Sequence, residues 1–108
     1  MATYNITILG TSDTTGYKFS GSDFNGTIDS NSYDPTLTIE DGDSITFTFS
    51  QAALSHPFRI SKSGQPTFGD YAGGDSDATW TPSVDGAWTY ECTSHSSMAG
   101  TINVLSST

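Results

Sequence analysis

Sulfur and imidazole side chains are scarce in this sequence. Its 108 residues include one cysteine, two histidines and two methionines, one of which is Met1. A single cysteine excludes a disulfide within the chain. Any site that needs these side chains must therefore be built from very few candidates.

Basic residues are almost as scarce. Lys18, Arg59 and Lys62 stand against twelve acidic residues, which gives a formal net charge of -9. A nucleic acid partner is disfavoured, because its phosphates would be repelled. The charge favours a basic or neutral partner, and an acidic surface that only keeps the protein soluble explains it equally well.

The sequence also lacks a long apolar run, so no membrane insertion is expected. The N-terminal residues Met1–Asn5 include no basic residue and no apolar stretch of the kind found in signal peptides. The compartment stays open: periplasmic or extracellular if this is a mature form, otherwise cytoplasmic or virion-associated.

Length and composition predict one all-β domain over residues 1–108. Only 33% of the residues are hydrophobic, and threonine and serine, which suit the solvent face of strands, are abundant. Short alternating runs separated by turn residues predict seven to eight strands and no helix. We therefore expect a Greek-key β-sandwich or barrel.

The predicted strands are bounded by glycine, proline and polar turns. They cover residues 3–9, 17–19, 35–40, 44–49, 56–61, 78–82, 87–92 and 100–105. Asp41-Gly42-Asp43 between two alternating runs predicts a hairpin turn. The segments 10–16, 21–34 and 62–77 are predicted as a turn region, a long connecting loop and a surface excursion.

Three kinds of metal-binding side chain occur together near the C-terminus, spaced Cys92-x2-His95-x2-Met98, and the remaining histidine is His56. Thiolate, thioether and imidazole suit copper, whereas calcium and magnesium prefer oxygen ligands. One cysteine and two histidines in a plane, with a weak axial methionine, form the ligand set of a blue-copper electron-transfer site. The chain supplies this set once.

Each of these residues alone has an ordinary structural explanation. A lone cysteine is most often a buried small hydrophobe, and a histidine in a strand is more often a core residue than a ligand. The joint occurrence favours a metal site, because three of the four scarce side chains fall in one short loop. We predict a mononuclear copper site, cycling between Cu(I) and Cu(II), at His56, Cys92, His95 and Met98.

The C-terminal pattern Tyr90-x-Cys92-x2-His95-x2-Met98-x-Gly100-x-Ile102-x-Val104 resembles that of the cupredoxins, the small blue-copper proteins such as plastocyanin and amicyanin. The stretch from Pro35 to Phe47 resembles the strand pair that precedes the first histidine ligand in that family. The resemblance covers residues 35–105 well and residues 1–34 in outline.

This resemblance implies a role for each ligand. His56, Cys92 and His95 would be equatorial ligands and Met98 the axial one. His95 would lie nearest to solvent, so a redox partner protein would dock beside it. The protein would be a monomeric one-electron carrier and not an enzyme, because four protein ligands leave no open position on the metal.

The sequence departs from the family in two places. Pro57 follows His56 where the family commonly has an asparagine that ties the two ligand-bearing loops together. We expect Ser55 or Thr93 to substitute for it, or else a looser site. The ligand loop also carries Ser94, Ser96 and Ser97 where relatives often have proline or apolar residues, so the docking face is more polar.

Two other functions stay open. The chain could be a structural or adhesion module, for example of a phage virion, whose copper site is structural or vestigial. A copper chaperone or storage domain is disfavoured, because a buried thiolate with three further ligands holds copper and does not release it. A second copper centre is excluded, because both histidines are already used.

Overall fold

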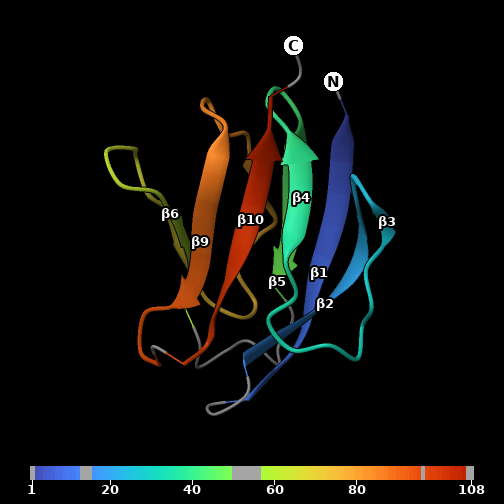
Figure 1. Cartoon of the computed structure of the whole chain (residues 1–108). Helices are drawn as coiled ribbons and strands as arrows, with labels where there is room; N and C mark the ends of the chain where they lie inside the picture. The colour runs from blue at the N-terminus through green and yellow to red at the C-terminus, as the bar shows by residue number, and fades with distance from the viewer. Residues whose placement is uncertain (1, 13–15, 50–56, 96, 107–108) are drawn as a thin grey trace.

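Two five-stranded sheets face each other in the computed structural model, which describes residues 2–12, 16–49, 57–95 and 97–106 (Figure 1). The strands within these residues are β1 Thr3–Ser12, β2 Gly16–Asp23, β3 Gly26–Thr27, β4 Leu37–Glu40, β5 Ser44–Phe49, β6 Phe58–Ser61, β7 Phe68–Tyr71, β8 Ala78–Trp80, β9 Gly86–Cys92 and β10 Ala99–Leu105. No described helix is long and apolar enough to cross a membrane.

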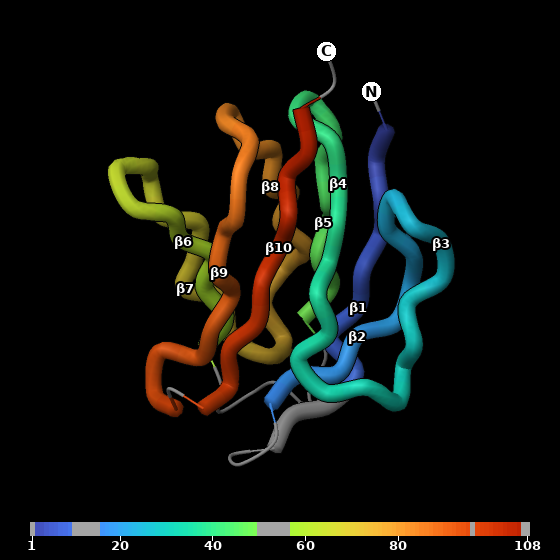
Figure 2. The backbone as a smooth tube through the Cα atoms, viewed as in Figure 1, coloured from blue at the N-terminus to red at the C-terminus, as the bar shows by residue number. Residues whose placement is uncertain are grey.

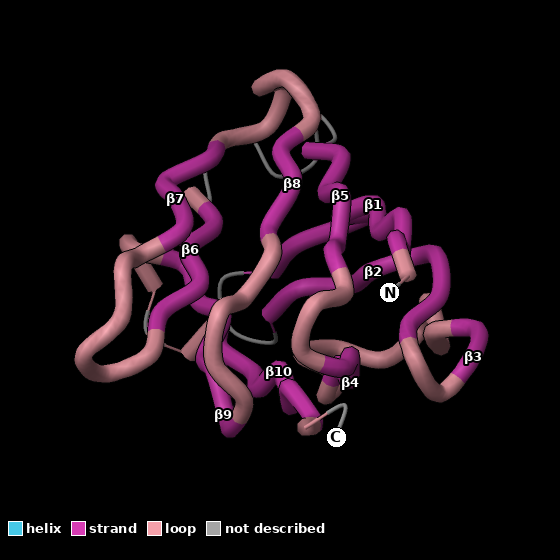
Figure 3. Tube along the Cα trace, turned by 90° about the horizontal axis from the view of Figure 1, so that it is seen from above, coloured by secondary structure: helices cyan, strands magenta, loops and turns pink. Residues whose placement is uncertain are grey.

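The strand order is β3-β2-β1-β5-β8 in one sheet and β4-β10-β9-β6-β7 in the other, seen end-on in Figure 3. Parallel pairs occur between β1 and β5 and between β10 and β4, and the remaining pairs are antiparallel. The start of β2 and the loop from β9 to β10 lie at the same end of the sandwich (Figure 2). This end carries the predicted ligand loop.

Aromatic rings fill the space between the sheets. Phe58 of β6 has its ring centroid 5.1 Å from that of Phe47 and 5.3 Å from that of Tyr17, both of the opposite sheet. The Tyr90 ring of β9 lies 5.1 Å from Phe19 in an edge-to-face arrangement. Since successive strand residues point to opposite faces, the alternating apolar residues of each strand form this interior.

The strands richest in alternation were predicted correctly. Ile45, Phe47 and Phe49 of β5 are buried, as are Ile102 and Val104 of β10. The described residues form ten strands against the seven to eight expected, and they confirm the all-β sandwich. The start of the fifth predicted strand, at His56, lies outside the described residues, as does the preceding stretch 50–55.

The predicted hairpin around Asp41-Gly42-Asp43 is wrong, although the turn itself exists. Asp43 donates its N–H to the Glu40 carbonyl at 3.1 Å, but β4 pairs with β10 whereas β5 pairs with β1. The turn therefore passes the chain from one sheet to the other. A turn dipeptide specifies local chain reversal, and it does not specify which neighbours the two strands take.

Three segments predicted as irregular contain strands. β1 continues to Ser12 and β2 begins at Gly16, so the turn region 10–16 is mostly strand. The loop predicted over 21–34 includes the end of β2 and the short β3, and that over 62–77 includes β7. These strands are glycine-rich or mostly exposed, so they lack the alternation that sequence analysis detects.

We predict that Asp43→Ala lowers the free energy of unfolding by about 2–4 kcal/mol, since two N–H groups lose a charged acceptor. The buried carboxylate accepts hydrogen bonds from Ala2 N at 2.8 Å and Glu40 N at 3.0 Å, which joins the beginning of β1 to the β4–β5 turn. Denaturant unfolding measures the change. Asp85→Ala removes the same charge from an exposed position and should stay within about 0.5 kcal/mol of the parent.

Candidate metal centre

The alternation of β9 directs Cys92 into the interior. Trp88, Tyr90 and Cys92 are buried, and the residues between them are exposed or half-buried. Cys92 is the last residue of β9, so its side chain lies at the end of the core where the chain leaves the sheet. A strand end of this kind presents a buried thiol directly beneath a surface loop.

The loop after β9 brings His95 beside Cys92. The Cys92 Sγ lies 3.6 Å from His95 Nδ1, and the backbone N–H of Ser94 donates to the same sulfur at 3.4 Å. Cys92 is 2% exposed, whereas His95 is half-buried. The sulfur is thus shielded, and the imidazole lies between it and the surface.

The spacing of these two atoms fits ligands of a common metal. Thiolate sulfur and imidazole nitrogen at about 2.3 and 2.0 Å from one ion, as for zinc, would lie roughly 3.5–3.7 Å apart at tetrahedral or trigonal angles. The observed separation of 3.6 Å falls within this range. The pair can therefore accept a metal ion without a large rearrangement.

Two backbone hydrogen bonds close the ligand loop. Cys92 N donates to the Met98 carbonyl at 2.9 Å, and Met98 N donates to the His95 carbonyl at 3.0 Å. The Met98 side chain is fully buried. Cys92, His95 and Met98 thus belong to a compact turn that is closed by backbone hydrogen bonds.

The predicted set of four ligands is described only in part, because His56 lies outside the described residues. Within the described ranges, no group of three or more His, Cys, Asp or Glu side chains lies close enough together to hold a metal. Only two of the predicted ligands, Cys92 and His95, are of those types and inside those ranges. The four-ligand site therefore remains a prediction.

The connection expected at Pro57 is made by the backbone of Thr93. Thr93 N donates to the Pro57 carbonyl at 3.1 Å, and Phe58 pairs with Cys92 between β6 and β9. Proline has no N–H, but its carbonyl still accepts hydrogen bonds. One of the two substitutes that we expected thus ties the ligand loop to the segment after His56; the other, Ser55, lies outside the described residues.

Sequence analysis missed Tyr17, which reaches this site from the opposite sheet. The fully buried side chain donates its hydroxyl to the Pro57 carbonyl at 3.3 Å. Burial raises the pKa of Tyr17, and the charge of Cys92 and a hydrogen bond with its side chain raise that pKa further. Sequence analysis placed Tyr17 only in the short predicted strand 17–19, and nothing in the sequence connects it with Cys92, 75 positions later.

The backbone of Tyr17 is held by Asp34. Tyr17 N donates to Asp34 Oδ1 at 2.9 Å, and Asp34 N donates to the Tyr17 carbonyl at 2.7 Å. Asp34 has a φ of 50°, a conformation that aspartate and asparagine tolerate better than most residues. The loop predicted as a plain connector thus holds one wall of the site.

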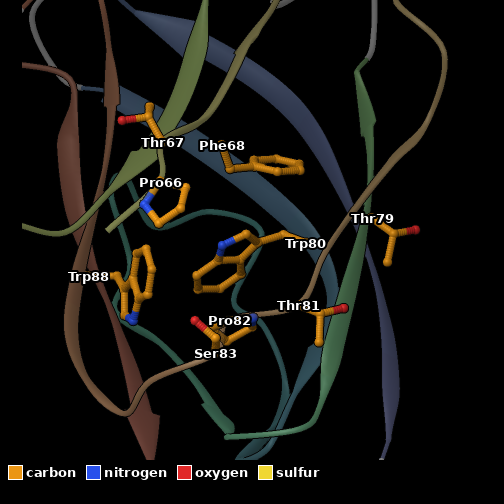
Figure 4. Close-up of a pocket in the computed structure, with 9 residues that line it drawn as sticks. All are labelled: Pro66, Thr67, Phe68, Thr79, Trp80, Thr81, Pro82, Ser83 and Trp88. Carbon is orange, nitrogen blue, oxygen red and sulfur yellow. The ribbon is translucent and has the colours of Figure 1, made fainter. Parts of the chain in front are cut away.

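Away from the ligand loop, a hollow with a volume of about 290 Å³ lies beside Trp88 of β9. Figure 4 shows Trp80 and Trp88 beside Pro66, Phe68 and Pro82 around it. Both tryptophans are buried, as expected for core residues, and their rings meet edge-to-face at 5.3 Å. Cys92, His95 and Met98, the predicted ligands that the structure describes, do not line this hollow.

We predict that Asp34→Asn stabilises the protein more at neutral than at acidic pH. Burial raises the pKa of the Asp34 carboxyl, and the hydrogen bond from Tyr17 N only partly opposes this. The contribution of Asp34 to stability is thus fully present below its unfolded pKa and is lost as pH rises through the folded pKa. Asparagine keeps an acceptor for Tyr17 N and never ionises.

Thermal or denaturant unfolding across the acidic range measures this difference. Asp85→Asn, at an exposed position, controls for the lower net charge. A gain for Asp34→Asn that is equal at all pH values, or larger at acidic pH, would contradict the prediction.

No protein-family model and no curated protein sequence matches this chain at a significant level. Solved structures do match. A Sinorhizobium pseudoazurin has a TM-score of 0.59 and 22% identity, over 96% of this chain and 74% of its own. Reduced rusticyanin has a TM-score of 0.54 and 22% identity, over 94% and 77%, and rusticyanin from Thiobacillus ferrooxidans has 0.53 and 20%, over 94% and 75%. The chain therefore has the cupredoxin fold, a two-sheet all-β sandwich.

Proposed function

We propose that this chain binds one copper ion in a mononuclear type 1 site and carries single electrons. The observation that carries the proposal is the 3.6 Å separation of the Cys92 sulfur and the His95 nitrogen, in a loop already closed by its backbone. The fold adds support, since rusticyanin, which shares it at low identity, is described as a copper protein and is known in a reduced form.

The proposed ligands are His56, Cys92, His95 and Met98. Thiolate, two imidazoles and a thioether favour copper among the common metals, and a weak axial thioether is typical of electron-transfer sites. The ion would supply a one-electron couple, and the protein would supply a fixed set of ligands. Cys92 must lose its proton on binding, so copper binding releases a proton and weakens as the pH falls.

We further propose that electrons pass through the His95 edge to a redox protein. Thr93, Ser94 and Ser97 around it are exposed, and His95 itself is half-buried above the buried Cys92. Among the three proposed ligands within the described residues, the most accessible one therefore lies in a polar, hydroxyl-rich rim. With a net charge of -9, the protein would suit a basic or neutral partner and act as a monomer.

We predict that one equivalent of Cu(II) gives the metal-free protein an intense visible band from thiolate-to-copper charge transfer. Ascorbate should bleach the band, and a mild oxidant should restore it. Cys92→Ser should fold and lack the band, because serine supplies no thiolate. A folded parent protein without any such band would refute the electron carrier and favour the structural or adhesion module.

We predict that Met98→Leu keeps the visible band and raises the reduction potential. Leucine has nearly the volume of methionine, so the buried site should lose less than about 1.5 kcal/mol of stability. A thioether donor stabilises the oxidised ion, and its loss should favour the reduced one. Redox titration of both proteins gives the change, and an unaltered potential would exclude Met98 as the axial ligand.

A further inference from the structure

Tyr17, from the β3-β2-β1-β5-β8 sheet, reaches the segment that is tied to the ligand loop. Its hydroxyl lies 3.3 Å from the Pro57 carbonyl, which also receives Thr93 N at 3.1 Å. Its ring packs at 5.3 Å against Phe58, the cross-strand partner of Cys92, and after burial a hydrogen bond with the Cys92 side chain is among the causes that raise the pKa of Tyr17. One buried group therefore contacts both segments on which the proposed ligands lie.

The ring of Tyr17 has little freedom to move away. It packs edge-on against Phe58 at 5.3 Å and against Tyr90 at 6.2 Å, and it is not exposed to solvent. Asp34 fixes its backbone through hydrogen bonds in both directions. Such a supported side chain can hold a hydroxyl at a defined place, which a free surface tyrosine cannot.

The hydroxyl carries one hydrogen, which rotates to the better acceptor. In the metal-free protein, the Pro57 carbonyl is available to it. A thiolate is a charged acceptor, and hydrogen bonds to charged groups are stronger than those to neutral groups. We therefore expect the hydroxyl hydrogen to turn toward the sulfur when Cys92 binds copper as a thiolate.

We propose that Tyr17 is a positioning residue that holds the Cys92 sulfur against the Pro57 segment and, in the copper protein, donates a hydrogen bond to the thiolate. The second part rests on the copper site proposed above. Such a bond withdraws electron density from sulfur. It favours the reduced ion, in which the thiolate keeps more negative charge, and so it raises the reduction potential.

Tyr17→Phe removes only the hydroxyl, and Tyr90→Phe is a matched control. Both tyrosines are fully buried, and both donate to a proline carbonyl: Tyr17 to Pro57, and Tyr90 to Pro35 at 2.6 Å. Of the two tyrosines, only Tyr17 has a pKa that, besides burial, the Cys92 side chain also raises. A purely structural role would give similar effects in the two variants.

The first measurement uses metal-free protein and a small neutral alkylating reagent. Cys92 is 2% exposed, so its reaction requires local opening. Loss of the hydroxyl that anchors the Pro57 segment beside the sulfur should speed alkylation about five-fold in Tyr17→Phe relative to Tyr90→Phe. Equal rates in the two variants would overturn the positioning role, whether or not the protein binds copper.

The second measurement is the reduction potential of the copper-loaded proteins. Tyr17→Phe should shift the equilibrium toward the oxidised ion by up to about ten-fold, which is 59 mV lower for a one-electron couple. The charge-transfer band should also move to longer wavelength, because sulfur lone pairs without a donor lie higher in energy. Tyr90→Phe should show neither change.

The two proposals fail separately. If the parent protein forms no thiolate-to-copper band, the proposed function is wrong, and the alkylation rates still decide the role of Tyr17 in metal-free protein. Suppose instead that the parent forms the band while Tyr17→Phe keeps the potential and spectrum of the parent. In that case the copper site is supported, and the proposed hydrogen bond from Tyr17 to the thiolate is refuted.

Discussion

The hydrogen bond from Cys92 N to the Met98 carbonyl is the contact on which the candidate site depends. Cys92 is the last residue of β9, and Met98 directly precedes β10. Because β9 and β10 are paired, the bond fixes both ends of the loop to the sheet. Inside that closure, a second bond from Met98 N to His95 turns the chain and leaves the imidazole 3.6 Å from the sulfur. The paired strands and the backbone of the loop therefore arrange the side chains that we propose as ligands.

A site arranged in advance suits electron transfer more than storage. Because the loop, the Thr93–Pro57 bond and the aromatic interior restrict the ligands, a change of oxidation state would find little room for rearrangement. The sandwich also buries a hydrophobic core of its own, which small metal domains that are unfolded without their ion lack. Binding would add stability to a sandwich that already has its own core.

The sequence specified the ligand loop better than it specified the sheets. The scarce side chains and the alternation of β9 predicted that Cys92, His95 and Met98 gather at one strand end, and the structure brings them there. It did not predict that the Asp41–Asp43 turn changes sheets, because turn chemistry is local and strand partners are not. Tyr17 was missed for the same reason: its contact with Pro57 joins positions that only the sandwich brings together.

The contacts around the candidate site show how this chain can share a fold with known structures at low sequence identity. The fold constrains mainly which positions face inward, and many apolar side chains satisfy that requirement. The contacts around the ligands are less interchangeable, since each needs a donor at a particular place. Here a proline removes one such donor beside His56, and a backbone amide and a tyrosine hydroxyl from the opposite sheet meet at its carbonyl. The segments of Pro57 and Cys92 are thus joined by chemical groups other than the asparagine side chain expected at position 57. A comparison of sequences alone would count this replacement as divergence.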